Sequence, residues 1–501
     1  MTPIADMAEP IADEVAVGGL PYGFARRSRV VVRATPAGPE CVHDTAAPLA
    51  GLLEVQRLYG AGLRFAAVPT AQFDQILATQ YRDSARQAAD FADSELDLAA
   101  LADSAAAVDD LLDQRDDSPV IRLINALLLE AVKEGASDIH IETQEKRLIV
   151  RFRVDGVLRD VVEPRRALAP LLVSRIKVMA RLDIAERRIP QDGRVTLRIG
   201  GQDVDARVST IPTQHGERVV LRLLDKGGAR LDLSSLGMSD RDVAVFEKLL
   251  ERPHGLLLVT GPTGSGKTTT LYAGLTTLND RRRNIMTVED PIEYELEGVA
   301  QTQVNPRTDL TFARGLRAIL RQDPDVIMVG EIRDQETAEV AVRSAMTGHF
   351  VLSTLHTNSA VGSVTRLIDM GVERYLLAPM VAGLIAQRLV RRLCQSCARA
   401  DRASDADAVL LGGAIRAGDP VWRPVGCADC HQDGYRGRVA IYEVVVVDDR
   451  MQAMIHDGAA EADLVRTART GGPSLLDDGV ARIRDGTTTV EEVARVVRDE
   501  A

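Results

Sequence analysis

Eight consecutive residues, Gly261 to Thr268 (GPTGSGKT), have the types and spacing of a phosphate-binding loop. They follow the apolar run LLLVT and precede the helix-forming run TTTLYAGLTTL, and this context disfavours a glycine-rich turn without a ligand. Glycines let successive backbone N–H groups point at phosphate oxygens, and the following helix N-terminus adds partial positive charge. We expect Lys267 to contact the β- and γ-phosphates and the hydroxyl of Thr268 to hold Mg²⁺. The expected nucleotide-binding residues are Gly261, Pro262, Thr263, Gly264, Ser265, Gly266, Lys267, Thr268 and Thr269.

A second segment, Asp325 to Glu331 (DVIMVGE), is an apolar strand that ends in an acid. In a doubly wound sheet, the carboxyl ends of the strands meet at the crevice where ligands bind. Glu331 is therefore expected to hold Mg²⁺ directly or through water. The competing interpretation is that Glu331 only caps the next helix.

Two further strand ends carry groups that could act on water or phosphate. Val288 to Glu295 (VEDPIEYE) offers Glu289 as first choice for the general base and Glu293 as second, against the alternative of an exposed acidic loop. Ser353 to Asn358 (STLHTN) contains His356, which could sense the γ-phosphate by hydrogen bonding. A lone histidine at a strand end is more often structural.

Four of the five cysteines form two CxxC pairs, Cys394 with Cys397 and Cys427 with Cys430. This spacing predicts one tetrahedral zinc site with four thiolate ligands, which is structural because no position stays open for water. Closing the loop between the pairs costs about 3 kcal/mol, whereas a structural zinc site contributes about 10–16 kcal/mol. Disulfides or bare thiols are the alternatives. Cys41 has no partner in the sequence pattern and is interpreted as a small apolar residue.

The order of elements around these segments predicts an α/β protein of several domains. Helices alternate with wholly apolar strands from about residue 231, which indicates a parallel sheet covered by helices. Before it, Ser118 caps an expected helix, and Asp155 with Gly156 forms an expected hairpin turn. We divide the chain into a tail (1–20), an N-terminal module (21–81), an acidic linker (82–117), an α+β domain (118–228), a nucleotide domain (229–385), a tetracysteine subdomain (386–440) and a helical C-terminal subdomain (441–501).

The amino-acid composition bears on which partners the protein can bind and on the cellular compartment in which it works. The net charge of −12 and the aromatic content of 3% argue against nucleic-acid binding. Arg388, Arg391 and Arg392 form a local basic cluster if they lie on a helix. No stretch approaches the roughly 20 apolar residues of a spanning helix, and the N-terminus lacks the pattern of an export signal. We therefore expect a cytoplasmic protein that reaches a membrane through partners or a surface patch.

The phosphate loop and the three acidic or histidine segments together resemble the secretion ATPases of the type II secretion and type IV pilus superfamily. In that family the segments of Glu289, Glu331 and His356 are the aspartate box, an atypical Walker B motif and the histidine box. The resemblance spans roughly residues 120–500. It implies a RecA-like P-loop domain after an α+β (PAS-like) domain, ATP hydrolysis with Mg²⁺, a hexamer, and an active-site role for His356.

The same resemblance implies arginines that reach the nucleotide. An arginine delivered from a neighbouring subunit raises the rate about 10³–10⁵-fold in phosphoryl transfer. By the sequence alone, an ordinary surface arginine is the more frequent interpretation of each. The candidates are Arg194, Arg207 and Arg222 from the α+β domain, with Arg317, Arg321 and Arg333 from the nucleotide domain as phosphate-side or interface residues.

The tetracysteine module is similar to that of type II secretion and pilus-assembly ATPases and unlike the pilus-retraction subgroup, and the short N-terminal module resembles that of the general secretion pathway ATPase. This implies that the N-terminal module binds the cytoplasmic domain of an inner-membrane protein, and that an inner-membrane platform protein is a second partner. The alternatives are a type IV pilus-assembly ATPase, a RecA-like nucleic-acid motor, and an ATP-binding scaffold without turnover.

Overall fold

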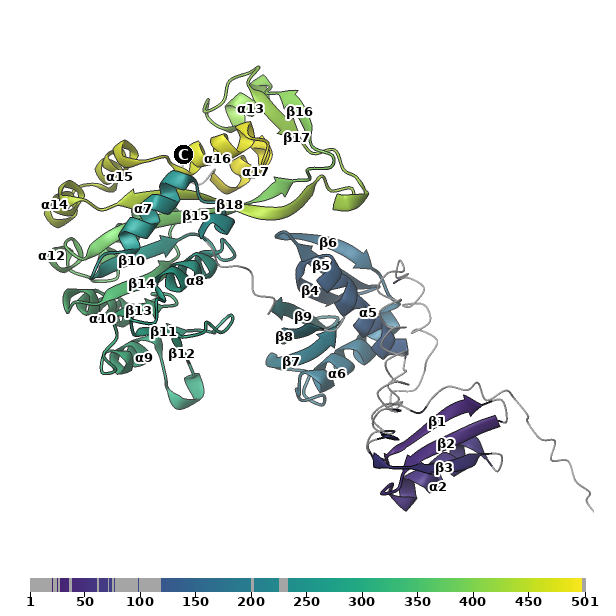
Figure 1. The fold of residues 1–501 in the computed structure, drawn as a ribbon. Coiled ribbons are helices and arrows are strands. Elements are labelled where there is room, and N and C mark those ends of the chain that lie inside the picture. The colour runs from purple at the N-terminus through teal and green to yellow at the C-terminus, as the bar shows by residue number, and fades with distance from the viewer. Residues whose placement is uncertain are drawn as a thin grey trace, which may run out of the picture. The chain divides into compact units, whose positions relative to one another are not determined.

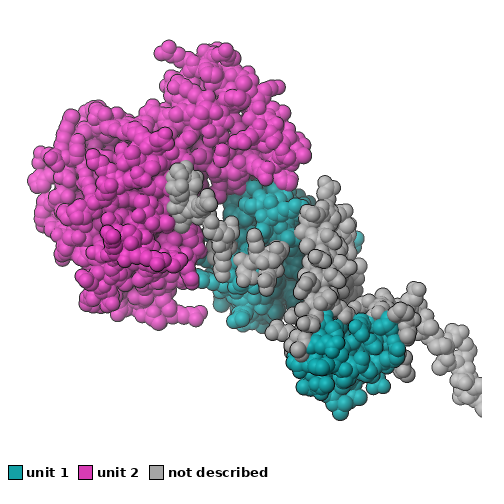
Figure 2. All heavy atoms as spheres, in the orientation of Figure 1, with its two compact units in different colours: residues 1–154, 158–223 teal, residues 155–157, 224–501 magenta. Residues whose placement is uncertain are grey.

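The computed structural model describes residues 20, 25, 28–35, 38–60, 63–70, 72–73, 76, 98, 119–199, 202–224 and 233–497. The chain forms two compact units, residues 1–154 with 158–223 and residues 155–157 with 224–501 (Figure 2). The expected tail and acidic linker lie outside the described residues except for Leu20 and Leu98, and so does Ser118. In the part of the chain that is described, no helix is both long and apolar enough to cross a bilayer.

The N-terminal module contains a three-stranded sheet and helix α2. Its elements are β1 (Val30–Thr35), β2 (Gly38–Asp44), α2 (Leu49–Tyr59) and β3 (Arg64–Val68). The central strand β2 pairs antiparallel with β1 and parallel with β3. Helix α2 is followed by its C-cap Gly60, whose φ of +74° suits glycine. Cys41 is buried in this core, and burial raises the pKa of its thiol to about 11. A neutral, apolar role for Cys41 follows.

The α+β domain packs two helices on one face of an antiparallel sheet (Figure 1). Its elements are α5 (Pro119–Lys133), β4 (Ala136–Thr143), β5 (Leu148–Val154), β6 (Val157–Val162), the 3-10 turn η1 (Arg166–Leu168), α6 (Ala169–Met179), β7 (Gln191–Ile199), β8 (Gln202–Thr213) and β9 (Gly216–Leu224). The strand order is β6-β5-β4-β9-β8-β7. The expected hairpin turn is confirmed, because Asp155 and Gly156 both have positive φ, at 51° and 85°.

The second unit is built on a seven-stranded sheet that is parallel except at one edge. In spatial order its strands are β12 (Ala300–Gln303), β11 (Ile285–Glu289), β13 (Val326–Val329), β14 (Phe350–Leu355), β10 (Gly255–Thr260), β15 (Val381–Leu393) and β18 (Tyr435–Val446). Successive residues of β10 enter different cores, Leu256 and Leu258 on one side and Leu257 and Val259 on the other. Both faces of the sheet are therefore covered, as the wholly apolar strands predicted.

Helices cover the two faces of this sheet, and additional short strands and helices belong to the same unit (Figure 1). Helix α7 (Asp240–Leu250) precedes β10, and the helices between the strands are α8 (Lys267–Leu278), α9 (Phe312–Ile319), α10 (Gln335–Met346), α11 (Gly362–Asp369) and α12 (Arg374–Leu377). Between β15 and β18 lie β16 (Arg399–Arg402), α13 (Asp405–Leu410) and β17 (Pro420–Arg423). The C-terminal helices are α14 (Asp449–Asp457), α15 (Glu461–Gly471), α16 (Leu475–Arg484) and α17 (Val490–Val497).

The basic cluster of Arg388, Arg391 and Arg392 does not lie on a helix, so that expectation was wrong. All three belong to β15, which pairs parallel with β10 and antiparallel with β18. Local spacing could not reveal these partners, which lie far away in the chain. Arg388 is buried and Arg392 is exposed, so the arginines do not form one basic surface. The expected domain boundaries at 385/386 and 440/441 fall inside β15 and β18, and the division itself stays a prediction.

Candidate nucleotide site and tetracysteine cluster

The phosphate loop joins β10 to α8 in the order that the sequence predicted. Gly264 and Gly266 have φ of +80° and +87°, a conformation that side chains other than glycine rarely adopt. Helix α8 begins at Lys267, so its N-terminus faces the loop. Ser265 is buried, and its Oγ has no hydrogen-bond partner among the described residues. A tight loop with an unused buried hydroxyl fits an oxyanion ligand such as a phosphate.

Lys267 is buried over this loop and is held by backbone carbonyls. Its Nζ donates to the carbonyl oxygens of Gly261 at 2.7 Å and Pro262 at 3.1 Å. Burial lowers the pKa of Lys267 to about 8, with Arg388 acting in the same direction and the charge of Glu331 opposing it. An ammonium in these surroundings would gain a strong partner from a phosphate.

The side chain of Glu331 links the segment that follows β13 to the segment that follows β14. Its carboxylate lies 3.3 Å from His356 Nε2 and 2.5 Å from the guanidinium of Arg333, and only 14% of its side chain is exposed. The alternative that Glu331 caps the next helix does not hold. Asp334 caps α10, because its Oδ1 accepts from the N–H of Thr337 at 2.8 Å.

Glu289 and Glu293, the two candidates for the general base, differ in their surroundings. Glu289 is 2% exposed and its carboxylate accepts from Tyr272 Oη, from Thr287 Oγ1 at 2.5 Å and from Gln301 Nε2 at 3.1 Å. Glu293 is exposed, and its backbone N–H donates to Tyr272 Oη at 3.4 Å. Tyr272, on α8, therefore connects the helix after the phosphate loop to the acidic segment.

The remaining arginine candidates lie in two places. On α9, Arg317 donates to Glu336 on α10 at 2.7 Å. Arg321, in the turn that follows α9, donates to the carbonyl of Arg317 at 2.7 Å. The other three belong to the α+β sheet, where Arg194 and Arg207 are directly opposite across β7 and β8, and Arg222 donates to Asp138 at 2.9 Å.

The four cysteines predicted to bind zinc come together. The Sγ atoms of Cys394, Cys397, Cys427 and Cys430 all lie within 4.8 Å of one another. Three of the separations are 3.8, 3.8 and 3.7 Å. Four sulfurs about 2.3 Å from a tetrahedral zinc would be about 3.8 Å apart, so the cluster fits this ion. The N–H groups of Cys427 and Gly434 both donate to Cys430 Sγ at 3.2 Å, which favours a thiolate.

Comparison with known proteins supports the interpretation drawn from these residues. The profile described as Type II/IV secretion system protein matches residues 113–495. The chain belongs to the type II/IV secretion system protein family. A second profile, which describes an N-terminal domain of GSPII protein E, matches residues 19–81 of this family member.

Relatives of this secretion-family chain align over almost its whole length. Type II secretion system protein E of Pseudomonas aeruginosa is 58% identical over 501 residues, which cover 99% of both chains. Type II secretion system ATPase E of Vibrio cholerae is 52% identical, with 99% of this chain and 100% of the relative covered. These matches confirm the predicted ATP hydrolase of the type II secretion kind and the predicted fold class, and they favour it over the pilus-assembly alternative.

Solved structures agree with the fold. The pilus retraction motor PilT with bound ADP has a TM-score of 0.52 and 28% identity, covering 74% of this chain and 96% of that chain. The ATPase DotB of Legionella pneumophila has a TM-score of 0.57 at 23% identity, covering 76% and 96%, and supports the fold alone. The family implies a nucleotide, Mg²⁺ and an oligomer that works with other secretion proteins.

Sequence reasoning missed several residues that contact the site. Gln387 and Arg388 of β15 reach the phosphate loop and the segment after β14, and Tyr272 and Gln301 hold Glu289. One signal was available for Gln387, because it is a polar residue directly after the apolar run VAGLIA. No comparable signal was available for Tyr272, which is an ordinary core residue of α8.

Proposed function

We propose that this chain hydrolyses ATP to power protein export by a type II secretion system, through assembly of a pseudopilus. The relatives named type II secretion system protein E support this system, since they cover nearly the whole chain. The observation that carries the proposal is the meeting of Glu331 with His356 and Arg333, close enough to Lys267 for the charge of Glu331 to act on its pKa.

Each group at this strand edge has a proposed role. Lys267 and the backbone of residues 261–269 bind the phosphates, and Thr268 and Glu331 hold Mg²⁺, Glu331 directly or through water. Bound Mg²⁺ neutralises charge that develops on the phosphate oxygens. His356 hydrogen-bonds the γ-phosphate while Glu331 fixes its ring. Arg333 is a further candidate for the phosphate side.

We assign the general base to the acidic segment, with Glu293 now preferred over Glu289. A base must be able to reach the attacking water. The carboxylate of Glu289 is buried and accepts three hydrogen bonds, which suits a residue that positions the segment. Glu293 is exposed, and its backbone is anchored through Tyr272, so its carboxylate is the better placed of the two to meet water.

The proposed assembly is a hexamer in which neighbouring subunits complete the sites. Arg194 and Arg207 lie directly opposite each other on β7 and β8, so their two positive side chains could contact one anionic group together. We propose that they, with Arg222, act on the nucleotide when the α+β domain closes over it. Arg317 and Arg321 are proposed as interface or phosphate-side residues.

The proposed location is the cytoplasm, at the inner membrane through protein partners. The profile matched at residues 19–81 supports the N-terminal module as the docking element for the cytoplasmic domain of an inner-membrane secretion protein, with a platform protein as second partner. Removing residues 1–110 should leave nucleotide binding intact and abolish membrane recruitment. Recruitment that survives this truncation would contradict the proposed role of the module.

The proposed metal at the cysteine cluster is one structural Zn²⁺ per chain. A four-sulfur site holds the two ends of residues 394–430 together, and it leaves no open position for chemistry. No nucleic acid is expected as a partner, so added DNA should not stimulate ATP hydrolysis.

A hydrolysis assay tests the central proposal. Wild-type chain should turn over ATP with Mg²⁺, whereas Lys267→Ala and Glu331→Gln should each lose about 10²-fold or more, because each removes charge stabilisation at the phosphates. Ser344→Ala is the matched control, since it removes a buried hydroxyl that donates to Val340 on α10 at 2.6 Å. Equal turnover by all four proteins, or none by the wild type, would rule out the proposed site.

A further inference from the structure

Gln387 is a buried polar residue that holds the phosphate loop from a distant strand. It lies on β15, is 2% exposed, and uses both ends of its amide. Its Nε2 donates to the carbonyl of Ser265 at 2.7 Å, and its Oε1 accepts from Thr270 Oγ1 at 2.7 Å. The loop and the first turn of α8 are therefore both attached to this one side chain.

The glycines of the loop lie directly against this residue. A Cβ placed on Gly261 would be 2.4 Å from the carbonyl oxygen of Gln387. A Cβ placed on Gly266 would be 2.8 Å from Gln387 Nε2. At these two positions, glycine is required by the approach of β15 as well as by the curvature of the loop.

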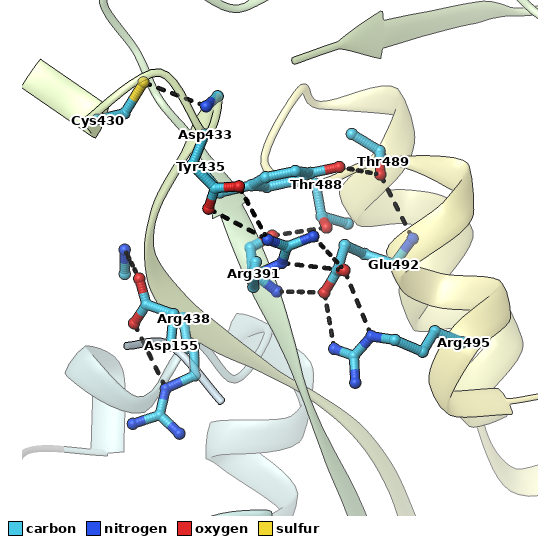
Figure 3. A network of polar contacts seen from close by, with 12 residues as sticks. Asp155, Arg391, Cys430, Asp433, Tyr435, Arg438, Thr488, Thr489, Glu492 and Arg495 are labelled. Atoms are coloured by element: carbon cyan, nitrogen blue, oxygen red, sulfur yellow. Dashed lines mark hydrogen bonds and ion pairs between the residues drawn. The ribbon is translucent and has the colours of Figure 1, made fainter. Parts of the chain in front are cut away.

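The same strand is attached to the histidine segment and is anchored at its far end. Arg388, 4% exposed, donates from Nη2 to the carbonyl of Asn358 at 2.5 Å. Farther along, the backbone N–H and the Nε of Arg391 donate to Glu492 of α17 at 3.0 and 3.1 Å, and its guanidinium stacks on Tyr435 (Figure 3). These contacts fix β15, which makes it a firm support for the loop.

We propose that Gln387 is a positioning residue for nucleotide binding, which holds the phosphate loop in its binding shape through Ser265 and Thr270. Gln387 makes no contact with the phosphates and acts through the loop backbone. The inference rests on the proposed binding of ATP at residues 261–269.

The test compares two variants with one matched control. Gln387→Leu removes both hydrogen bonds, while Gln387→Glu keeps the acceptor for Thr270 and places a carboxylate beside the carbonyl of Ser265. Each should weaken binding of a fluorescent ADP analogue with Mg²⁺ about tenfold or more, and raise KM for ATP by a similar factor with a smaller change in kcat. Ser344→Ala should lower the melting temperature of the nucleotide-free protein without changing this affinity.

The outcomes separate this inference from the proposed function. If the wild type binds the analogue and a folded Gln387 variant binds it within about twofold, the positioning role is overturned while ATP binding stands. If the wild type does not bind it, the proposed site itself fails. If neither Gln387 variant folds, Thr270→Val supplies the test, because it removes the bond to Oε1 while Gln387 keeps its bond to Ser265. Affinity about threefold weaker supports the proposal, and unchanged affinity overturns it.

Discussion

The two large sheets of this chain distribute their charged residues in opposite ways. In the parallel sheet, β10, β13 and β14 are buried along their whole lengths, and the polar groups follow the strand ends. In the antiparallel sheet, apolar residues such as Val208 and Leu221 face the helices, and their neighbours Arg207 and Arg222 lie on the other face. A sheet that is covered on both faces can present reactive side chains only at the ends of its strands. A sheet with one uncovered face can present charged side chains on that face to a partner.

This contrast has a consequence for how each set of residues works. Lys267, Glu331 and His356 are brought together within one unit by the fold itself. The arginines of the open face belong to the other unit, and we propose that they act on a nucleotide held by another domain or subunit.

The largest effect is expected from an arginine of the open face. Arg207→Ala should lower ATP turnover about 10³-fold, because an arginine delivered to the transferring phosphate acts mainly in the transition state. Nucleotide affinity and melting temperature should change little. Arg151→Ala is the matched control, since Arg151 also lies in this sheet, where it pairs with Glu142 at 2.6 Å. Equal losses in both variants would show that the sheet needs its charges only for stability.

The two glutamates of the acidic segment should have different roles, one in the chemical step and one in stabilising the fold. Glu293→Gln should lower kcat about 10²-fold at unchanged melting temperature, because a general base is lost. Glu289→Gln should lower the melting temperature, since its amide cannot accept all three hydrogen bonds of the carboxylate. Turnover and unfolding are measured on the same preparations. The reverse pattern would return the base assignment to Glu289.

Nucleotide affinity should depend on pH through Lys267. Its ammonium binds phosphate in the charged form, and burial has lowered its pKa to about 8. Below this pH, the charge is present and affinity is constant; above it, the free protein must take up a proton to bind, so affinity falls. The dissociation constant of the ADP analogue should rise about tenfold between pH 7 and pH 9. Lys267→Ala should bind weakly at both values with no such step, and a flat wild-type profile would contradict the lowered pKa.

The smallest effect on the nucleotide is expected from the cysteine cluster. Cys427→Ser with Cys430→Ser should abolish zinc binding, measured by metal analysis, and lower the melting temperature. Affinity for the ADP analogue should stay within about twofold, because among the described residues the cluster and the phosphate loop share no direct hydrogen-bond partner. A large loss of affinity would mean that β15 transmits damage from the cluster to the loop.

Much of the parallel sheet, and the residues at the ends of its strands, could be predicted from the sequence. Short apolar runs that are followed by glycine, an acid or histidine fit few other structures. The segments of Glu331 and His356 were recognisable for this reason, and the four cysteines by their spacing. The β15 arginines were misplaced on a helix, since their spacing fits a helix and their strand partners are distant. The ordering of Glu289 and Glu293 needed coordinates, because Tyr272 meets Glu289 only in the folded sheet.

The contacts of Gln387 are a second feature that could not be predicted from the sequence. Its partner Ser265 lies 122 residues earlier, and no local pattern joins them. The glycines of the loop were interpreted only through phosphate, although two of them also make room for β15. Sequence patterns therefore identified the residues that are expected to contact a ligand. They did not identify the residues that hold those ligand-contacting residues in position.

The most direct measurement is a crystal structure of the chain with Mn²⁺ and a non-hydrolysable ATP analogue, with the metal located by its anomalous signal. The account predicts phosphates on the backbone of residues 261–268, and Mn²⁺ between Thr268 and Glu331, bound to Glu331 directly or through a water. Phosphates away from this loop, or Mn²⁺ without either side chain near it, would contradict the account.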